Sequence, residues 1–338
     1  MSVVIPLHDY GHFLTECVDS ILGQEGVEVD VLIIDDASSD DSLAVARALA
    51  GDPRVSVSAN GINRGMIPTI NDGLWSVDGE YVVKMDADDI LTPGALARAT
   101  ALLDADDSLG FVYGFPVAFS DSPPPPARTS VRSWTVWLGR DWLEIRCRKG
   151  RNCIMQPEVV MRTAVLHRAG PYKPDLPHGS DLEMWLRLAA LANVGRVNGA
   201  HQGYYRVHQQ SMQRQMDNYY LRDLEAVGRA FESVFADVGA LVPGAAELHS
   251  MARRAVAESA LRHAWRAYDE RQGPIDDYLA FAVARWPEMA RSPRWRSLDA
   301  RNRTARRAAQ EPGARAARRS IRDLEDRLRW RRWRWAGV

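Results

Sequence analysis

The chain has 338 residues and a formal net charge of −1, with 46% hydrophobic and 26% charged residues. This composition is typical of a soluble globular protein with a sizeable core, and the sequence contains no run of 18 apolar residues that could form a membrane-spanning helix. No charged segment followed by a hydrophobic block precedes the first apolar run, so we expect no signal peptide and a cytoplasmic protein. The length favours one large domain with an appendage.

Charge is unevenly distributed along the chain. Residues 291–338, here called the basic tail, contain 16 arginines and 5 acidic residues, whereas the first 290 residues carry a net charge of −12. The three cysteines, Cys17, Cys147 and Cys153, are odd in number and lack metal-ligand spacing. We therefore expect reduced thiols in the core.

Strand and helix patterns alternate over the first 115 residues. Buried strands are predicted at residues 3–7, 29–34, 55–58, 81–85 and 111–115. Helices are predicted at residues 13–24, 43–49 and 67–76, and from Pro93 onwards. This alternation predicts an α/β fold with a Rossmann-like, mostly parallel sheet between layers of helices, in which ligands bind beyond the carboxyl ends of the strands.

Less regular patterns follow. Four prolines at residues 123–126 require an exposed, stiff loop. One further strand and two helices are predicted at residues 157–162, 163–169 and 182–192. Ser180 and Glu183 have the spacing of a capping box, which begins a helix. Strand patterns then stop, which predicts one domain over residues 1–215 and a helical C-terminal region over residues 216–338.

Two acidic clusters directly follow predicted strands. Asp35 and Asp36 end one strand, and Asp86, Asp88 and Asp89 end another. Mg²⁺ prefers oxygen ligands and often uses one or two carboxylates together with phosphates and water, so Asp86 and Asp88 are candidate ligands. An Asp-x-Asp triplet alone is a weak signal, because surface loops are rich in aspartate. Its place after a buried strand makes the signal stronger.

Four motifs follow one another along the chain: Val3-Val4-Ile5-Pro6, Val31-Leu32-Ile33-Ile34-Asp35-Asp36, Asn63-Arg64-Gly65 with Asn71-Asp72-Gly73, and Gly79-Glu80-Tyr81-Val82-Val83-Lys84-Met85-Asp86-Ala87-Asp88-Asp89. Their order and spacing resemble the inverting glycosyltransferases of family 2, which have the GT-A fold. A later segment, Gly179-Ser180-Asp181-Leu182-Glu183, extends the resemblance to residues 1–210. The resemblance implies transfer of a hexosyl or N-acetylhexosaminyl group from a nucleotide diphosphate to an acceptor hydroxyl.

The resemblance also implies roles for single residues. The residues implied to bind the donor are Pro6, Leu7, Asp36, Asn63, Arg64, Asp86 and Ala87. Asp36 would accept a hydrogen bond from uracil or thymine, which favours a UDP or dTDP donor. Asp88 and His208 would hold Mg²⁺ or Mn²⁺, and Asp181 would be the general base. The family often has an arginine where this chain has Ile70, so the phosphate or sugar contact of that arginine is not carried over.

Several of these residues also have a structural interpretation. Asp35 and Asp36 can cap the helix that follows, and a carboxylate at position 181 is favoured by the helix dipole, which would also keep Asp181 ionised. His208 can be a surface histidine. Either acceptor binding or core packing would suit Trp134, Trp137 and Trp142.

The basic tail has a helical pattern over residues 315–335, with Ile321, Leu324, Leu328 and Trp335 along one side. A helix that combines arginine with tryptophan suits an anionic membrane surface or a lipid-linked acceptor. Packing against the acidic body or within a homo-oligomer is equally compatible. Nucleic-acid binding is disfavoured, because no base-reading motif accompanies the charge.

Other functions fit less well. A nicotinamide dehydrogenase needs Gly-x-Gly-x-x-Gly after the first strand, where this chain has only Gly11. A nucleotidyltransferase needs a glycine-rich, basic first loop, which is also missing. The non-enzymatic alternative is an inactive carbohydrate- or polyanion-binding protein, and the presence of both Asp88 and Asp181 argues against it. The acceptor is expected to be a glycan, a lipid-linked molecule or a small molecule.

Overall fold

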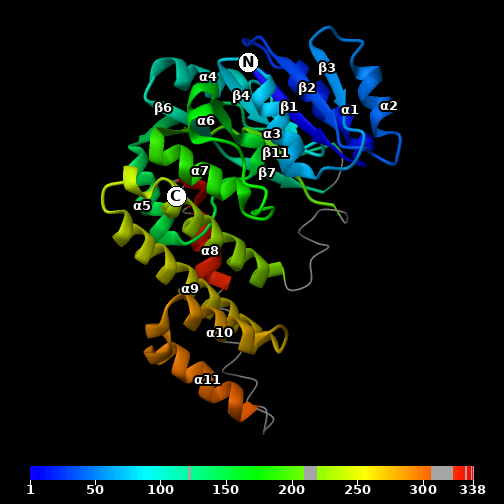
Figure 1. Ribbon diagram of the computed structural model, residues 1–338. Helices are drawn as coiled ribbons and strands as arrows, with labels where there is room; N and C mark the ends of the chain where they lie inside the picture. Colours follow the sequence, from blue (N-terminus) through cyan, green and yellow to red (C-terminus); the bar gives the residue numbers. More distant parts are fainter. Residues whose placement is uncertain (121–122, 209–218, 306–322, 332, 336, 338) are drawn as a thin grey trace. The chain divides into compact units, whose positions relative to one another are not determined.

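The computed structural model describes residues 1–120, 123–208, 219–305, 323–331, 333–335 and 337 (Figure 1). The chain forms two compact units. The first consists of Met1–Trp142 and Ile154–Gln209, and the second of Leu143–Cys153 and Gln210–Val338.

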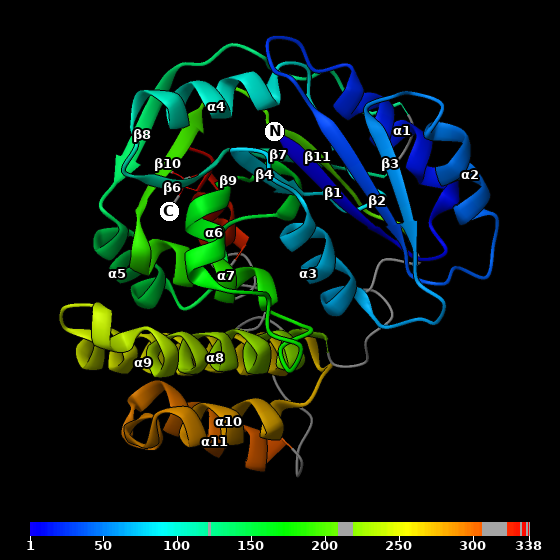
Figure 2. The ribbon, with the colours of Figure 1, turned by 45° about the horizontal axis from the view of Figure 1, so that its top comes forward.

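An eight-stranded sheet forms the centre of the first unit (Figure 2). In spatial order its strands are β3 (Val55–Ala59), β2 (Asp30–Asp35), β1 (Ser2–Leu7), β4 (Tyr81–Lys84), β9 (Val160–Arg162), β6 (Leu109–Tyr113), β10 (Asn193–Asn198) and β8 (Ser133–Trp137). All of these strands except β9 and β8 run in the same direction. The mostly parallel sheet predicted from the sequence is therefore confirmed.

Helices cover both faces of this sheet. The helices concerned are α1 (Gly11–Leu22), α2 (Ser42–Leu49), α3 (Met66–Ser76), α4 (Ala95–Ala105), α6 (Thr163–Ala169) and α7 (Ser180–Leu191), and α5 (Gly139–Lys149) is divided between the two units. α1 and α4 share a hydrophobic cluster with Val3 and Ile5 of β1. α3 packs on the opposite face, where Gly73 lies so close to Val4 and Ile34 that a Cβ atom would overlap with both. Alternating side chains of β1 thus pack against the helices on opposite faces of the sheet.

A second, three-stranded sheet holds the loop that follows β4. Its strands, in order, are β5 (Ile90–Leu91), β11 (Gly203–Arg206) and β7 (Pro116–Phe119). β5 follows residues 86–89 and pairs with β11, which precedes His208. This pairing brings the acidic cluster close to a histidine that lies 120 residues beyond Asp88 in the sequence.

The predicted capping box of α7 is wrong. The helix begins at Ser180, its N-cap is Gly179 in the left-handed conformation (φ 84°), and no side chain caps it. Glu183 instead is fully buried and forms an ion pair with Arg187 at 2.6 Å. A buried tertiary contact therefore replaces the local hydrogen bond that the sequence pattern suggests.

Other differences concern single elements. The strand predicted over residues 157–162 begins only at Val160, because Gln156–Glu158 forms a turn of 3₁₀-helix. The helix predicted to begin at Pro93 begins at Ala95. The sequence patterns did not reveal β7, β8, β10 or α5.

The second unit is built of helices. They are α8 (Tyr219–Asp237), α9 (Ala245–Glu270), α10 (Ile275–Arg285), α11 (Pro293–Ala305) and the helical residues 323–331 and 333–335. Trp333 is buried and its Nε1 donates to the Cys153 carbonyl oxygen over 2.9 Å, which attaches the end of the basic tail to residues 143–153 of the same unit. Ile321 of the predicted apolar side lies outside the described residues.

All three cysteines are buried and none of them forms a disulfide bond, as expected. No helix among the described residues is both long and apolar enough to cross a membrane.

Candidate functional site

The candidate site lies at the carboxyl ends of three neighbouring strands. Pro6 and the buried Leu7 end β1, Asp35 ends β2, and Lys84 ends β4. The parallel register pairs Leu7 with Asp35, so the loops that follow these strands leave the sheet from one edge. Ligands of parallel α/β sheets bind at this edge.

The Asp36 carboxylate organises the loop between β3 and α3. Its Oδ1 accepts hydrogen bonds from the Asn60 side chain (2.7 Å) and from the Arg64 backbone N–H (2.9 Å), and its Oδ2 accepts one from the Gly65 backbone N–H (2.8 Å). Burial raises the pKa of Asp36, but these hydrogen bonds outweigh burial and hold the pKa below its usual range. A carboxylate oxygen can accept two hydrogen bonds, so Oδ2 retains acceptor capacity.

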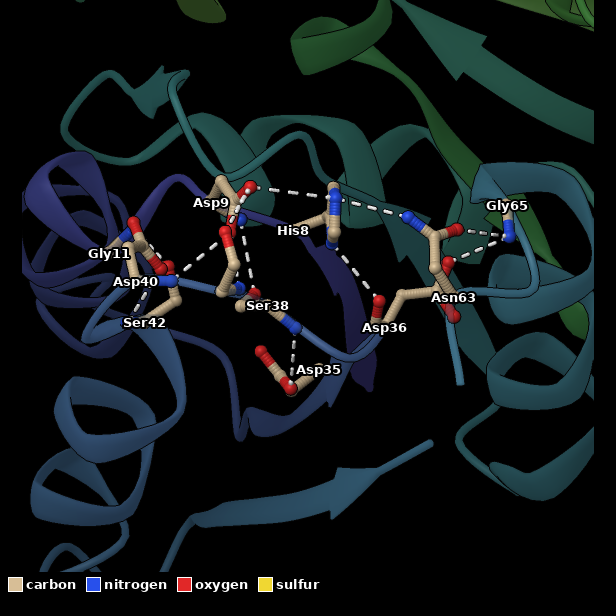
Figure 3. A network of polar contacts seen from close by, with 11 residues as sticks. His8, Asp9, Gly11, Asp35, Asp36, Ser38, Asp40, Ser42, Asn63 and Gly65 are labelled. Carbon is tan, nitrogen blue, oxygen red and sulfur yellow. Dashed lines mark hydrogen bonds and ion pairs between the residues drawn. The ribbon is translucent and has the colours of Figure 1, made fainter. Parts of the chain in front are cut away.

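Figure 3 shows His8 between Asp36 and the same loop. Its Nδ1 lies 3.0 Å from the Asp36 backbone oxygen, and its Nε2 lies 3.0 Å from Nδ2 of Asn63. Because the Asn63 amide nitrogen donates, Nε2 accepts and Nδ1 carries the proton. Sequence reasoning left His8 unassigned, since its partners lie in two loops that are distant in the sequence. The only available signal was its position directly after β1.

Two residues at these strand ends have a strained backbone. Asp9 and Ala37 both adopt a φ of 56°, in the left-handed region. The Asp9 carboxylate accepts a hydrogen bond from the Ser39 backbone N–H (2.6 Å), and the Asp9 backbone N–H donates to Oγ of Ser38 (3.0 Å). The Ser39 contact is the main reason that the pKa of Asp9 is lowered. Such strain persists where surrounding contacts fix it, and it is common at functional sites.

The motif that contains Asn63-Arg64-Gly65 and Asn71-Asp72-Gly73 forms contacts between α3 and the neighbouring loops. Arg64 forms an ion pair with Asp72, and both side chains are exposed. Asn71 exchanges two hydrogen bonds of 2.8 Å with the backbone of Tyr172, which ties α3 to the loop before α7. Ile70 is fully buried, so this position provides a core contact in place of a charge.

Asp89 fixes the acidic loop to β11. It is buried, and its Oδ1 accepts a hydrogen bond from the Arg206 backbone N–H (2.9 Å). Nε of Arg206 in turn donates to the Asp88 backbone oxygen (2.8 Å). The Arg206 guanidinium lies 4.7 Å from the ring centre of Phe13 and 4.5 Å from that of Phe119, in a cation–π arrangement. The loop therefore presents Asp88 and the buried Ala87 from a fixed backbone.

The two residues predicted to hold a metal ion lie side by side. His208 Nε2 is 3.0 Å from Asp88 Oδ2, and the imidazole is flanked by Tyr10 and Phe13. Burial and the neighbouring Asp86 raise the pKa of Asp88. A carboxylate and an imidazole fit a divalent cation that completes its shell with phosphates and water. Among the described residues, no group of three or more protein ligands could hold a metal ion.

Asp181 lies in the first turn of α7 beside a buried lysine. Nζ of Lys84 is 3.6 Å from Asp181 Oδ1 and 3.0 Å from Asp86 Oδ1. Burial raises the pKa of Asp181, Lys84 offsets part of this increase, and Asp86 adds to it. Sequence reasoning did not assign Lys84.

Buried polar groups surround Asp181. The atoms without a hydrogen-bond partner among the described residues include Asp181 Oδ1, the Tyr172 hydroxyl, Glu158 Oε2 and Trp185 Nε1. Burial raises the pKa of Tyr172 and of Glu158, and the charge of Asp181 raises both further. Buried polar atoms usually find partners, so this cluster suits a ligand that carries several hydroxyl groups.

The three tryptophans have different surroundings. Trp142 is fully buried and packs edge-on against Phe111. Trp137 is partly buried and stacks on Tyr113. Trp134 lies on the edge strand β8 and is 42% exposed, so of the three it is the candidate for a sugar contact.

The chain is similar in sequence to a known family and to several known proteins. The family model described as "Glycosyl transferase family 2" matches residues 2–164. An uncharacterized protein of Mycobacterium tuberculosis is 30% identical over 216 residues, which are 56% of this chain and 61% of that protein. An uncharacterized glycosyltransferase of Haemophilus influenzae is 23% identical over 244 residues, which are 66% of this chain and 75% of that protein.

Two solved structures share the fold. TarS 1–349 of S. aureus in complex with UDP-GlcNAc has a TM-score of 0.59 and 16% identity, covering 85% of this chain and 82% of that chain. The mannosyltransferase PcManGT of Pyrobaculum calidifontis in complex with GDP-Man and Mn²⁺ has a TM-score of 0.50 and 19% identity, covering 88% and 81%. At these identities the likeness shows the fold.

Proposed function

Residues 2–164 form a glycosyl transferase family 2 domain, and from this premise we propose that the protein transfers a sugar from a nucleotide diphosphate to an acceptor hydroxyl. One observation carries the proposal. The edge of a single sheet brings together an aspartate suited to bind a nucleobase (Asp36), an aspartate suited to bind a cation (Asp88) and a partly buried aspartate suited to accept a proton (Asp181).

Asp181 acts as the general base. The acceptor hydroxyl gives its proton to the Asp181 carboxylate while its oxygen attacks the anomeric carbon. The bond between that carbon and the diphosphate oxygen breaks, and its electron pair leaves with the nucleotide diphosphate. Attack from the side opposite the leaving group inverts the anomeric configuration. The raised pKa of Asp181 supports this role, because a stronger base takes the proton more readily.

The donor is a UDP-sugar or a dTDP-sugar. Asp36 is ionised, and its Oδ2 has acceptor capacity for the ring N–H of uracil or thymine. The complex of TarS with UDP-GlcNAc supports a uridine nucleotide. The complex of PcManGT holds GDP-Man, so the fold alone does not select the base. Asp36 is the residue on which the selection depends.

Asp88 and His208 would hold Mg²⁺ or Mn²⁺. When bound, such an ion neutralises the negative charge that develops on the departing diphosphate. The Mn²⁺ in the PcManGT complex supports this assignment. Asp86, held by Lys84 beside the same loop, would contact the ribose or the sugar.

A donor panel tests the proposed function. The protein is incubated with UDP-, dTDP- and GDP-sugars and Mn²⁺ or Mg²⁺, and the released nucleotide diphosphate is measured. We expect slow release from a UDP- or dTDP-sugar that stops when EDTA removes the metal. If no donor is cleaved although carbohydrate still binds, the chain is an inactive carbohydrate-binding protein instead.

The basic tail supplies a surface that suits anionic lipids, where a lipid-linked acceptor would lie. Leu324, Leu328 and Trp335 are 57%, 46% and 78% exposed and recur at helical spacing, with exposed arginines such as Arg327 beside them. Trp333 is buried, so one side of the helix is anchored and the apolar stripe faces outwards. Apolar side chains flanked by arginine are typical of helices that lie on membranes.

Vesicle sedimentation checks this surface. A variant with Leu324→Ser, Leu328→Ser and Trp335→Ala should bind phosphatidylglycerol vesicles at least about tenfold more weakly, because burial of even one apolar side chain contributes about 1.5–3 kcal/mol. Trp134→Ala, which removes an exposed tryptophan of the first unit, is the control and should bind like the wild type. Equal sedimentation of the triple variant and the wild type would exclude the contact.

A further inference from the structure

Lys84 is a buried cation within the candidate site. Its side chain is only 2% exposed, and its ammonium contacts both Asp86 and Asp181. The backbone is held from two directions, because β4 pairs with β1 at Val4 and because Nε2 of Gln156 donates to the Lys84 carbonyl oxygen over 3.0 Å. The sheet thus fixes the backbone from which the buried side chain extends to the two carboxylates.

The other titratable groups around Asp181 are acidic. Asp86 follows β4, Glu158 lies in the turn before β9, and Tyr172 precedes α7; each interacts electrostatically with Asp181. Among the described residues, Lys84 is the cation that lies within ion-pair distance of Asp181.

Two further cations of the described residues, one on α7 and one in the loop before it, are paired with another carboxylate. Arg187 and Lys173 both pair with Glu183, at 2.6 and 3.7 Å. Asp181 and Asp86 are each about one third exposed, and carboxyl groups that lie this close together and partly out of water favour the uptake of a proton by one of them unless a counter-charge is present. A protonated Asp181 could not accept the proton of an acceptor hydroxyl.

We propose that Lys84 is the positioning residue that keeps Asp181 ionised and oriented as the general base. This inference rests on the proposed function, in which Asp181 is that base. The ammonium lies on the Oδ1 side of Asp181, which leaves Oδ2 for the acceptor hydroxyl. Because the same ammonium holds Asp86, the residue expected to contact the donor, Lys84 also fixes the base relative to the donor.

Lys84 itself is not a proton acceptor. Burial favours the neutral amine, but the charges of Asp181 and Asp86 outweigh burial and raise the pKa of Lys84 above its usual range. The ammonium therefore keeps its protons throughout the reaction. The proton lost by the acceptor hydroxyl goes to Asp181, and the two ion pairs of Lys84 change in strength while no bond to Lys84 forms or breaks.

The pH dependence of kcat/KM tests this inference. The probe is UDP-GlcNAc, or whichever sugar nucleotide the donor panel shows to be cleaved fastest, and released nucleotide diphosphate is measured. Lys84→Met should move the acid limb of the profile to a higher pH by about 1–3 pH units, the usual effect of an opposite charge at this distance. Lys84→Arg retains the charge and should keep the acid limb close to that of the wild type.

Lys173→Met is the matched control. It removes a lysine from a buried carboxylate, but that carboxylate is Glu183, so the acid limb should stay in place. An equal loss of activity at every pH in Lys84→Met would overturn the inference, because it would mark a purely structural role. Thermal stabilisation by UDP checks the folding of each variant. Should Lys84→Met not fold, Lys84→Gln is measured with the same two outcomes.

Failure of the proposed function would look different from failure of this inference. If Asp181 is not the base, Asp181→Asn retains the wild-type rate whatever happens at Lys84. If Asp181 is the general base and Lys84 does not lower its pKa, Asp181→Asn is inactive and the acid limb of Lys84→Met coincides with that of the wild type.

Discussion

Replacing Asp181 by asparagine is expected to lower the rate of sugar transfer by about 10²–10⁴-fold, because an amide cannot accept the acceptor proton. The fold should persist, since asparagine has the same shape and Lys84 retains Asp86 as a partner. Donor binding, measured as thermal stabilisation by UDP and Mn²⁺, should be unchanged. In the wild type the pKa of Asp181 is raised, so the rate should fall with decreasing pH already above the usual range for aspartate. The residual rate of the variant should lack this acid limb.

A matched control is available in α5. Asp141 also lies in the first turn of a helix, and its side chain is 56% exposed. Asp141→Asn loses the same helix-dipole interaction, worth about 0.3–1 kcal/mol, without a role in transfer. Its rate and pH profile should match those of the wild type. A near-normal rate of sugar transfer by Asp181→Asn would show that Asp181 is not the general base.

Asp88→Ala is expected to abolish the response of the protein to Mn²⁺. Loss of a group that helps to stabilise the charge of the transition state typically costs about 10²–10³-fold in rate. The extra thermal stabilisation that Mn²⁺ gives to the UDP complex should disappear as well. Both quantities are measured across a Mn²⁺ titration.

Two further variants show whether this effect is specific. His208→Ala should also weaken Mn²⁺ activation, because His208 lies beside Asp88 at 3.0 Å. Asp107→Ala removes a carboxylate that is fully exposed and should leave the titration unchanged. A wild-type Mn²⁺ dependence in Asp88→Ala would contradict the metal assignment and would leave the role of Asp181 untouched.

The central sheet could be predicted well from the sequence where its strands are continuous apolar runs. β1, β2 and β4 are buried on both faces and are separated by amphipathic helices, which is the pattern of a parallel sheet. β8 lies at the sheet edge and buries little of its surface, so it gives no apolar run. β10 is interrupted by the buried Arg196. The prediction of a capping box was wrong because the Glu183 side chain is buried, where it forms ion pairs with Arg187 and Lys173.

The candidate site was only partly visible in the sequence. The motifs pointed to Asp36, Asp88 and Asp181, whose residue types are typical of their proposed roles. Lys84 was hidden within an otherwise apolar strand. A lysine in a buried strand is itself a signal, because a buried charge requires a partner, and two carboxylates provide it here. His8 gave no such signal, since its partners come from separate loops.

The pairing of β5 with β11 has a consequence for the folding of the chain during its synthesis on the ribosome. Asp88 meets His208 only after 120 further residues have been synthesised, and Glu16 meets Arg206 only after 190. Chains grow at about 5–20 residues per second, and domains tend to fold from the N-terminus as they emerge. The β1–β4 half of the sheet can therefore form while the cation site is still incomplete. A nascent chain would acquire the capacity for metal-dependent transfer in one late step, when β11 docks.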